Sequence, residues 1–218
     1  MNASLSQAAE ESKLNLAMNR YAMGDSQAFG ILHKALYPRL YAFLLRLGKS
    51  EAVADDLVQE TFLRMHRARS TFASQAAVIP WAYAIARNVH IDHTRAQKHR
   101  KTERLPSDPG PESAYRVDQN AERAAMTAQS MQAVSRVLAR IPEAQRSAFI
   151  LIRYEGLSLE QAAAVLGASV SAVKLRAFRA YEAIREELSA LGLVQENNSP
   201  SNTKNASESG ENAKEAKP

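Results

Sequence analysis

The sequence predicts an all-α protein made of two small helical domains joined by a flexible linker. Glycine and proline are scarce, with eight of each among 218 residues, and hydrophobic residues make up 45% of the chain. Apolar residues recur at helical spacing, and no stretch shows the sustained alternation typical of a half-buried strand. Pro106, Pro109, Gly110 and Pro111 cluster in one polar stretch, which we interpret as the exposed linker.

The first domain is expected over residues 12–98, after a flexible N-terminus of residues 1–11. Gly24 and Gly48 indicate helix ends, and Pro80 stands where the first turn of a helix tolerates it. The helices predicted from this punctuation and from the apolar spacing cover about residues 12–23, 26–47, 51–68 and 80–98.

The second domain is expected over residues 121–190, after a linker of residues 99–120. Pro142 and Gly156 separate its first helices. Residues 191–218 are mostly Asn, Ser, Glu and Lys without apolar periodicity, which predicts a disordered tail. The helices predicted in this domain cover about residues 121–139, 143–154, 159–166 and 170–188.

Composition narrows the classes of function. The absence of cysteine excludes a disulfide scaffold, a thiolate metal site and a cysteine nucleophile. No secretory signal pattern is visible and the apolar runs are too short to span a bilayer, so we expect a cytoplasmic protein. No metal, cofactor or small-molecule substrate is expected. The net charge of +5 includes two basic segments, residues 87–104 and 174–185, each on a predicted helix.

Residues 158–185 predict a helix-turn-helix. Ser158 is a good N-cap and Gln161 completes a capping box, which specifies a helix from Leu159. Ala163 is small enough for two helices to cross closely, and Gly167 permits the turn between them.

The second helix of this motif has two distinct faces. Its core face is expected to comprise Val170, Val173, Ala177, Ala180 and Ile184. On the opposite face, Leu175 and Phe178 would be exposed, flanked by the cations Lys174 and Arg179. This combination favours DNA binding over a merely solvated face. One position departs from the usual motif, because Arg176 stands where an apolar residue is typical; Ala177 or Phe178 is expected to substitute in the packing.

Two helices of the first domain carry candidate sites. The segment from Ala54 to Met65 is amphipathic, and its acidic face is either solvated or a docking surface for a basic partner; catalysis is not favoured. On the helix from Pro80, Asn88 and Asp92 are spaced i to i+4. They form either a polar pair in which Asp92 bridges to Arg95 or Arg87, or a small pocket near aromatic residues for an unstacked base.

The most specific feature of the sequence is the occurrence of three motifs in a fixed order. They read DDLVQETFLR at residues 55–64, PWAYAIARNV at residues 80–89, and LSLEQAA at residues 157–163 followed by VKLRAFRA at residues 173–180. With the linker between them, they make residues 18–188 resemble a bacterial RNA polymerase sigma factor of the extracytoplasmic-function (ECF) type.

That resemblance implies a role for each surface. Its sigma-2 domain would bind the clamp helices of the largest polymerase subunit through Asp55, Asp56, Gln59 and Glu60. The −10 promoter element would be melted and bound by Phe72, Trp81, Tyr83, Arg87, Asn88, Asp92 and Arg95, with the loop before their helix. The sigma-4 domain would read the −35 element through Ser169, Ser171, Lys174, Leu175, Arg176, Phe178 and Arg179.

The same resemblance implies further partners, namely the polymerase flap and an anti-sigma factor, which in this family is often membrane-bound. Two other classes stay open on the residues alone. A two-domain helix-turn-helix regulator would bind its DNA site without replacing sigma. A nucleic-acid enzyme is disfavoured, because the sequence has no carboxylate triad, nucleophile setting or phosphate loop.

Overall fold

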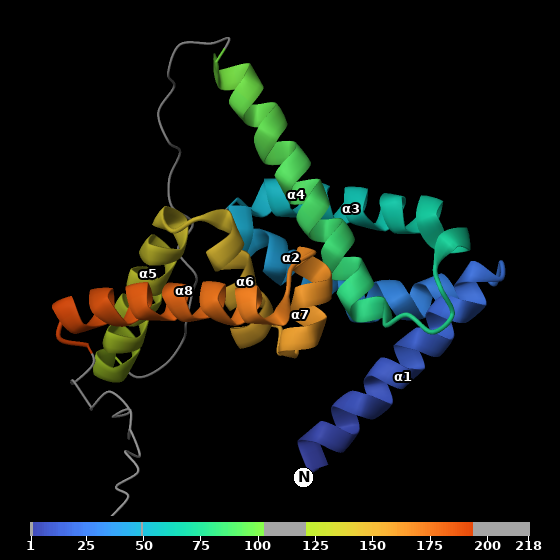
Figure 1. Ribbon diagram of the computed structural model, residues 1–218, viewed down its shortest axis with the longest axis horizontal. Coiled ribbons are helices and arrows are strands. Elements are labelled where there is room, and N and C mark those ends of the chain that lie inside the picture. The colour runs from blue at the N-terminus through green and yellow to red at the C-terminus, as the bar shows by residue number, and fades with distance from the viewer. Residues whose placement is uncertain (1, 49, 103–120, 194–218) are drawn as a thin grey trace, which may run out of the picture.

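The computed structural model describes residues 2–48, 50–102 and 121–193, which form eight α-helices and one short 3-10 helix without any strand (Figure 1). This confirms the all-α prediction. Most of the predicted linker and tail, residues 103–120 and 194–218, falls outside the described residues. The helices are α1 (Asn2–Ala22), α2 (Ala28–Gly48), α3 (Glu51–Ala68), η1 (Arg69–Thr71), α4 (Val78–Thr102), α5 (Ala121–Arg140), α6 (Glu143–Arg153), α7 (Leu159–Leu166) and α8 (Val170–Ala190).

Helices α1 to α4 form the first domain, with α2 packed against α1, α3 and α4. The apolar residues of α2 recur every three or four positions, which places one side of the helix in the core. Leu36, Leu40 and Phe43 are fully buried there, and the ring of Phe43 meets Tyr83 of α4 edge-on at 5.1 Å between centroids. The centre of this domain is therefore the crossing of α2 and α4.

Two helix limits differ from the prediction. Helix α1 begins at Asn2 rather than near Ser12, so residues 2–11, expected to be flexible, continue the helix. This stretch contains neither Gly nor Pro and is rich in Ala, which favours helix. Helix α4 likewise runs to Thr102, four residues beyond the expected end, through good helix formers such as Arg100 and Lys101.

Helices α5 to α8 form the second domain, in which α8 packs against α5, α6 and α7. Ile150, Leu151, Ala162 and Val173 are fully buried at the meeting of α6, α7 and α8. A smaller apolar cluster joins α5 to the end of α8. Within the described residues, none of the helices is long and apolar enough to cross a membrane.

The two domains also pack against each other, which the sequence did not predict. Helix α7 lies on α4, and α6 lies on α2, so that a single apolar core continues from the first domain into the second. Figure 1 shows α7 beside the first half of α4, while the second half of α4 projects away from both domains. The first half of α4 is thus shared between the domains and its second half is left open.

Candidate functional site

The acidic face of α3 is built by a well-specified helix. Ser50 caps it by accepting a hydrogen bond from the Val53 amide at 3.4 Å. Leu57 and Val58 are buried against α2 and α4. Asp56 and Gln59 then point to the opposite side, exposed and without a hydrogen-bond or ion-pair partner among the described residues. Two of the four predicted polymerase contacts are therefore free to meet a partner.

The other two predicted contacts are already engaged. The Tyr37 hydroxyl donates to Asp55 at 2.5 Å, and Arg64 pairs with Glu60 at 2.8 Å. Leu63 lies among these side chains and is 42% exposed, an apolar residue on a polar face that the sequence reasoning missed. Its position in the helical repeat was the available signal, because it falls between Gln59 and Asp56 around the helix rather than on the buried side.

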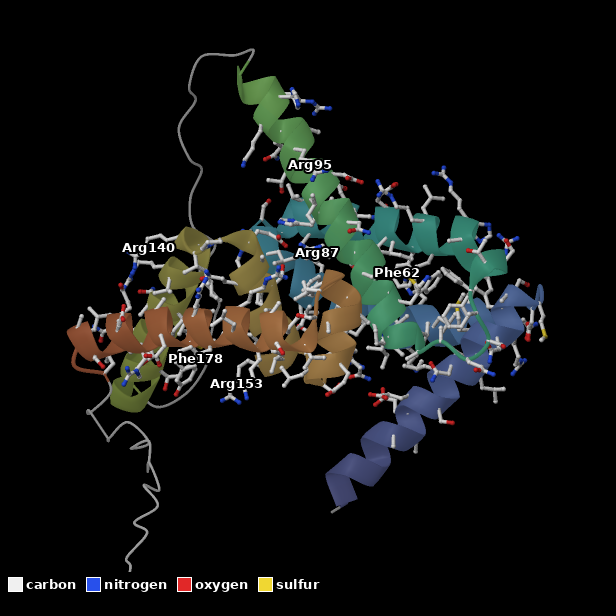
Figure 2. All side chains as sticks on the ribbon, in the orientation of Figure 1. Phe62, Arg87, Arg95, Arg140, Arg153 and Phe178 are labelled. Atoms are coloured by element: carbon white, nitrogen blue, oxygen red, sulfur yellow. The ribbon has the colours of Figure 1, made fainter. Side chains whose placement is uncertain are left out.

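Beside Leu63 the surface is apolar and aromatic. An open hollow of about 460 Å³ is lined by Tyr21, Ser26, Phe29, Phe62, Leu63 and His66. The rings of His33 and Phe62 lie 4.7 Å apart, and Phe29 meets Phe62 edge-on at 5.8 Å. Figure 2 labels Phe62 on α3 at this surface. The acidic face thus borders a hydrophobic one, which suits a partner helix with both basic and apolar side chains.

The start of α4 is fixed by the first domain. Asn15 of α1 accepts a hydrogen bond from the Val78 amide at 2.8 Å, which satisfies one of the free N–H groups at the helix end. Phe72 is 8% exposed and packs edge-on against Trp81 with centroids 5.0 Å apart. Of the predicted −10 contacts, Phe72 is therefore a packing residue in this conformation, and Trp81 is its partly buried neighbour.

Tyr83 and Arg87, also predicted to contact the −10 element, face the second domain instead. Tyr83 is fully buried and its hydroxyl donates to Glu155 at 2.6 Å. Arg87 donates two hydrogen bonds to Glu143, at 3.1 and 2.9 Å. In this arrangement neither side chain is open to DNA, because both contact the second domain, and Figure 2 shows Arg87 on the side of α4 that this domain covers.

Asn88, Asp92 and Arg95 are exposed on α4. Asp92 pairs with Arg64 of α3 at 2.7 Å, not with Arg87 or Arg95 as its alternative interpretation required, because α3 packs alongside α4. Asn88 has no side-chain partner among the described residues. Arg95 lies on the projecting half of α4 (Figure 2). These three side chains are the part of the predicted −10 set that this conformation leaves accessible.

The face of α4 that the second domain covers also buries a histidine, His90. Burial, together with the charge of Arg146, lowers the pKa of His90 from its usual 6.5, and Glu143 opposes this shift. As the pH falls through about 6.5, the unfolded chain takes up a proton at this position before the folded chain does, so the free energy of unfolding decreases.

We expect the melting temperature of the wild type to fall more steeply than that of His90→Gln between pH 7.5 and pH 6.0. Each 1 kcal/mol corresponds to about 2–4 °C in a chain of this size. Parallel slopes in thermal melts would contradict this role of His90.

The helix-turn-helix has the local features that the sequence predicts. Ser158 and Gln161 form a reciprocal capping box at the start of α7. Gly167 ends α7 in the left-handed conformation, at φ 57°, which a residue with a Cβ adopts only with strain. Ala163 is 8% exposed where the two helices meet. Ser169 caps α8 by accepting from the Ala172 amide, so its hydroxyl hydrogen remains available to a phosphate.

The outward face of α8 combines cations with exposed apolar side chains. Lys174 and Arg179 are exposed and form no ion pair within the described part of the chain. Leu175 is 48% and Phe178 58% exposed, and Figure 2 shows Phe178 on the outer side of the helix. Ser171 is exposed as well. These five side chains, which could read a major groove, are therefore accessible even while the domains are packed together.

The core face of α8 differs from the prediction at one position. Val170 is 38% exposed, because it is the first residue of the helix. Ala177 packs against the core whereas Phe178 does not, so Ala177 alone substitutes for the missing apolar residue. Arg176 is half-buried beside it and forms no ion pair among the described residues.

No group of three His, Asp or Glu side chains in the described residues is placed to hold a metal ion.

Comparison with known proteins matches both domains. Residues 32–100 match the family model of Sigma-70 region 2, and residues 131–184 match that of Sigma-70 region 4. The chain is 33% identical over 182 residues to the RNA polymerase sigma factor CarQ of Myxococcus xanthus, covering 81% of this chain and 98% of that protein. It is 34% identical over 180 residues to the ECF RNA polymerase sigma factor SigF of Caulobacter vibrioides, covering 82% of this chain and 95% of that one.

The chain belongs to the family of ECF RNA polymerase sigma factors. It is therefore a transcription initiation factor, and the stand-alone regulator is not favoured. In fold the sigma factor is similar to CnrH in its complex with the cytosolic domain of CnrY, with a TM-score of 0.62, 25% identity and coverage of 82% of this chain and 98% of that chain. The sigma factor RpoE of Bartonella quintana, solved with the anti-sigma factor NepR, is similar at a TM-score of 0.60 and 24% identity, covering 74% of this chain and 96% of that one.

The two matched regions enclose the candidate surfaces of the sigma factor. Region 2 covers the acidic face of α3 and all the predicted −10 residues on α4, and region 4 covers the whole outward face of α8. The sequence reasoning missed the contacts between the two domains. Glu143 and Glu155 bind side chains of the first domain, and no sequence spacing relates them to Arg87 or Tyr83.

Proposed function

We propose that this sigma factor binds core RNA polymerase through the acidic face of α3, with Asp56, Gln59 and Leu63 as its exposed centre. The observation that supports this most directly is that the two polar side chains have no partner within the described residues and border an apolar hollow. A basic, partly apolar helix such as the polymerase clamp helices would satisfy both properties at once. Asp55 and Glu60, held by Tyr37 and Arg64, would flank this centre.

The proposed promoter contacts divide between two helices. On α4, Asn88, Asp92 and Arg95 would bind the −10 element, with Asn88 and Asp92 holding an unstacked base of the non-template strand. On α8, Lys174 and Arg179 would take phosphates or guanine edges, and Leu175 and Phe178 would meet thymine methyl groups of the −35 element. Each contact is weak alone and becomes specific when polymerase holds both domains on one promoter.

The remaining assignments concern regulation and context. The factor would carry out no chemistry itself, since polymerase supplies the reaction, and it would act in the cytoplasm, where polymerase and promoters are. An anti-sigma factor would control it; the solved relatives CnrH and RpoE, each named as a complex with such a partner or with a cytosolic domain, support this assignment. The domains would comprise residues 12–98 and 121–190.

Promoter opening tests the assignment on α4. We expect Asn88→Ala and Asp92→Ala each to reduce open-complex formation by about tenfold while leaving polymerase binding unchanged, because a polar contact to a captured base is worth about 1–3 kcal/mol. The measurement is permanganate reactivity of unpaired thymines at −10. Arg67→Ala, an exposed arginine on α3, serves as the control. Wild-type reactivity in both variants would overturn the base-capture role.

A further inference from the structure

A short loop, residues 73–77, leads into α4 at one end of the face proposed to bind the unpaired strand. Phe72 before the loop and Val78 after it are buried, at 8% and 0% exposed. The residues between them are exposed except Ala76, which is half-buried. A single hydrogen bond within the loop joins the Ala76 amide to the Ala73 carbonyl at 2.8 Å. The core therefore anchors the two ends of the loop, and its middle depends on contacts from elsewhere.

Two asparagines of α1 supply those contacts. The side-chain amide of Asn19 donates to the Ser74 carbonyl oxygen at 3.2 Å, and the side-chain oxygen of Asn15 accepts from the Val78 amide at 2.8 Å. The two asparagines are one helical turn apart on the same side of α1, and Figure 1 shows α1 passing beside the segment before α4. In the described part of the chain, no other side chain bonds to the backbone of residues 73–78.

Helix α1 is itself held firmly at this point. Leu14, Met18 and Tyr21 are buried in the core of the first domain. The Tyr21 hydroxyl shares a hydrogen bond of 2.5 Å with His66 of α3, and the guanidinium of Arg69 in η1 lies 5.9 Å from the centre of the Tyr21 ring. Helix α1 thus contacts the chain both before the loop, at η1, and after it, at the start of α4.

The loop continues the proposed DNA-binding face of α4. Trp81 and Asn88 are seven residues apart and Asp92 follows four residues later, so the three share one side of the helix. At about 1.5 Å per residue, the start of α4 lies about 15 Å along the helix from Asn88. An unpaired strand that runs along this face from Asn88 therefore reaches the loop, whose exposed polar side chains are Ser74 and Gln75.

We propose that Asn15 and Asn19 are positioning residues for promoter opening, which hold the loop beside α4 so that the unpaired −10 strand meets a loop that is already ordered. The inference rests on the proposed binding of that strand by α4. Both asparagines act through the loop and not on the DNA. Without their hydrogen bonds the loop would have to be ordered when the strand binds, and the affinity would fall by that ordering cost.

The same substitution at both positions gives opposite expectations. Asn15→Asp keeps the oxygen that accepts from the Val78 amide, and its negative charge is favourable at the N-terminus of α4. Asn19→Asp replaces the donor by an oxygen that faces the Ser74 carbonyl oxygen. Both variants add the same charge to the same side of α1, so a difference between them reports on the hydrogen bonds. Asn15→Leu, which has no acceptor, should behave like Asn19→Asp.

Binding of the unpaired strand measures the effect. The full-length factor is combined with core polymerase and titrated, by fluorescence anisotropy, into a single-stranded non-template −10 oligonucleotide from a promoter on which the factor starts transcription. We expect Asn19→Asp and Asn15→Leu to bind about tenfold more weakly than wild type, which corresponds to about 1.4 kcal/mol, and Asn15→Asp to bind as wild type does. The affinity of all three for core polymerase should be unchanged.

Hydrogen exchange of residues 73–79 in the free factor tests the holding of the loop without DNA. Exchange should be faster in Asn19→Asp and Asn15→Leu but not in Asn15→Asp, because only the first two lose a bond to the loop. Wild-type exchange in both of those variants would overturn the holding of the loop. Equal losses of oligonucleotide binding in the two aspartate variants, or a parallel loss of polymerase binding, would overturn the positioning role.

Asn88→Ala separates this inference from the proposed function. If Asn88→Ala weakens oligonucleotide binding while Asn19→Asp and Asn15→Leu do not, the positioning role alone is wrong. If Asn88→Ala also binds like wild type, the proposed function of α4 is wrong and the role of the loop in opening falls with it. Hydrogen exchange still decides in that case whether α1 holds the loop.

Discussion

Asp56→Arg abolishes detectable binding of the sigma factor to core RNA polymerase; this is the largest functional effect that we expect. Asp56 is exposed on α3, has no partner among the described residues and lies beside Leu63. Reversing its charge opposite a basic clamp helix replaces an attraction by a repulsion, which costs several kcal/mol. Affinity should therefore fall by about 100-fold or more. Pull-down with purified core enzyme, followed by a titration, measures this.

A charge reversal elsewhere in the first domain is the matched control. Glu10 is an exposed carboxylate on α1, and Glu10→Arg should leave the affinity for core polymerase unchanged. Leu63→Ala should lie between the two, with binding about tenfold weaker, because it removes an apolar side chain that would be buried in the complex. Undiminished binding of Asp56→Arg would show that the acidic face is merely solvated.

Phe43→Ala should have the largest effect on stability. Phe43 is fully buried in α2, and its ring packs edge-on against Tyr83, whose hydroxyl bonds to Glu155 of the second domain. Removing a buried phenyl ring leaves a cavity and costs about 3–5 kcal/mol. The melting temperature should therefore fall by about 10 °C, and thermal unfolding followed by circular dichroism measures it.

Phe178→Ala is the same substitution on the surface. Phe178 is 58% exposed on α8, so its truncation should change the free energy of unfolding by no more than about 0.5 kcal/mol. It should weaken binding to a −35 duplex, because the side chain lies on the proposed reading face. Equal losses of stability in the two variants would contradict the assignment of Phe43 to the core and Phe178 to the DNA surface.

Local features of the structure followed from the sequence because their causes are local. The capping box of Ser158 and Gln161, the turn at Gly167 and the opposite faces of α8 each depend on residues a few positions apart. The acidic face of α3 was visible for the same reason. The exposed position of Leu63 also follows from the helical repeat of α3.

Contacts between distant segments did not follow from the sequence. Asp92 pairs with Arg64, which is 28 residues away, and Tyr83 bonds to Glu155, which is 72 residues away. Such partners depend on how helices pack, and several acidic residues would fit each arginine equally well in sequence. Three residues proposed for DNA, namely Phe72, Tyr83 and Arg87, therefore proved to be engaged within the protein in this arrangement.

The central claim is that this chain gives core polymerase a promoter specificity through two domains. The most direct test is transcription in vitro from fragmented genomic DNA with purified core polymerase, with and without the factor, followed by sequencing of the RNA 5′ ends. The account predicts transcripts that depend on the factor and whose start sites share one −10 and one −35 sequence at fixed spacing. Transcripts identical to those of core polymerase alone, from a factor that is folded by circular dichroism, would contradict it.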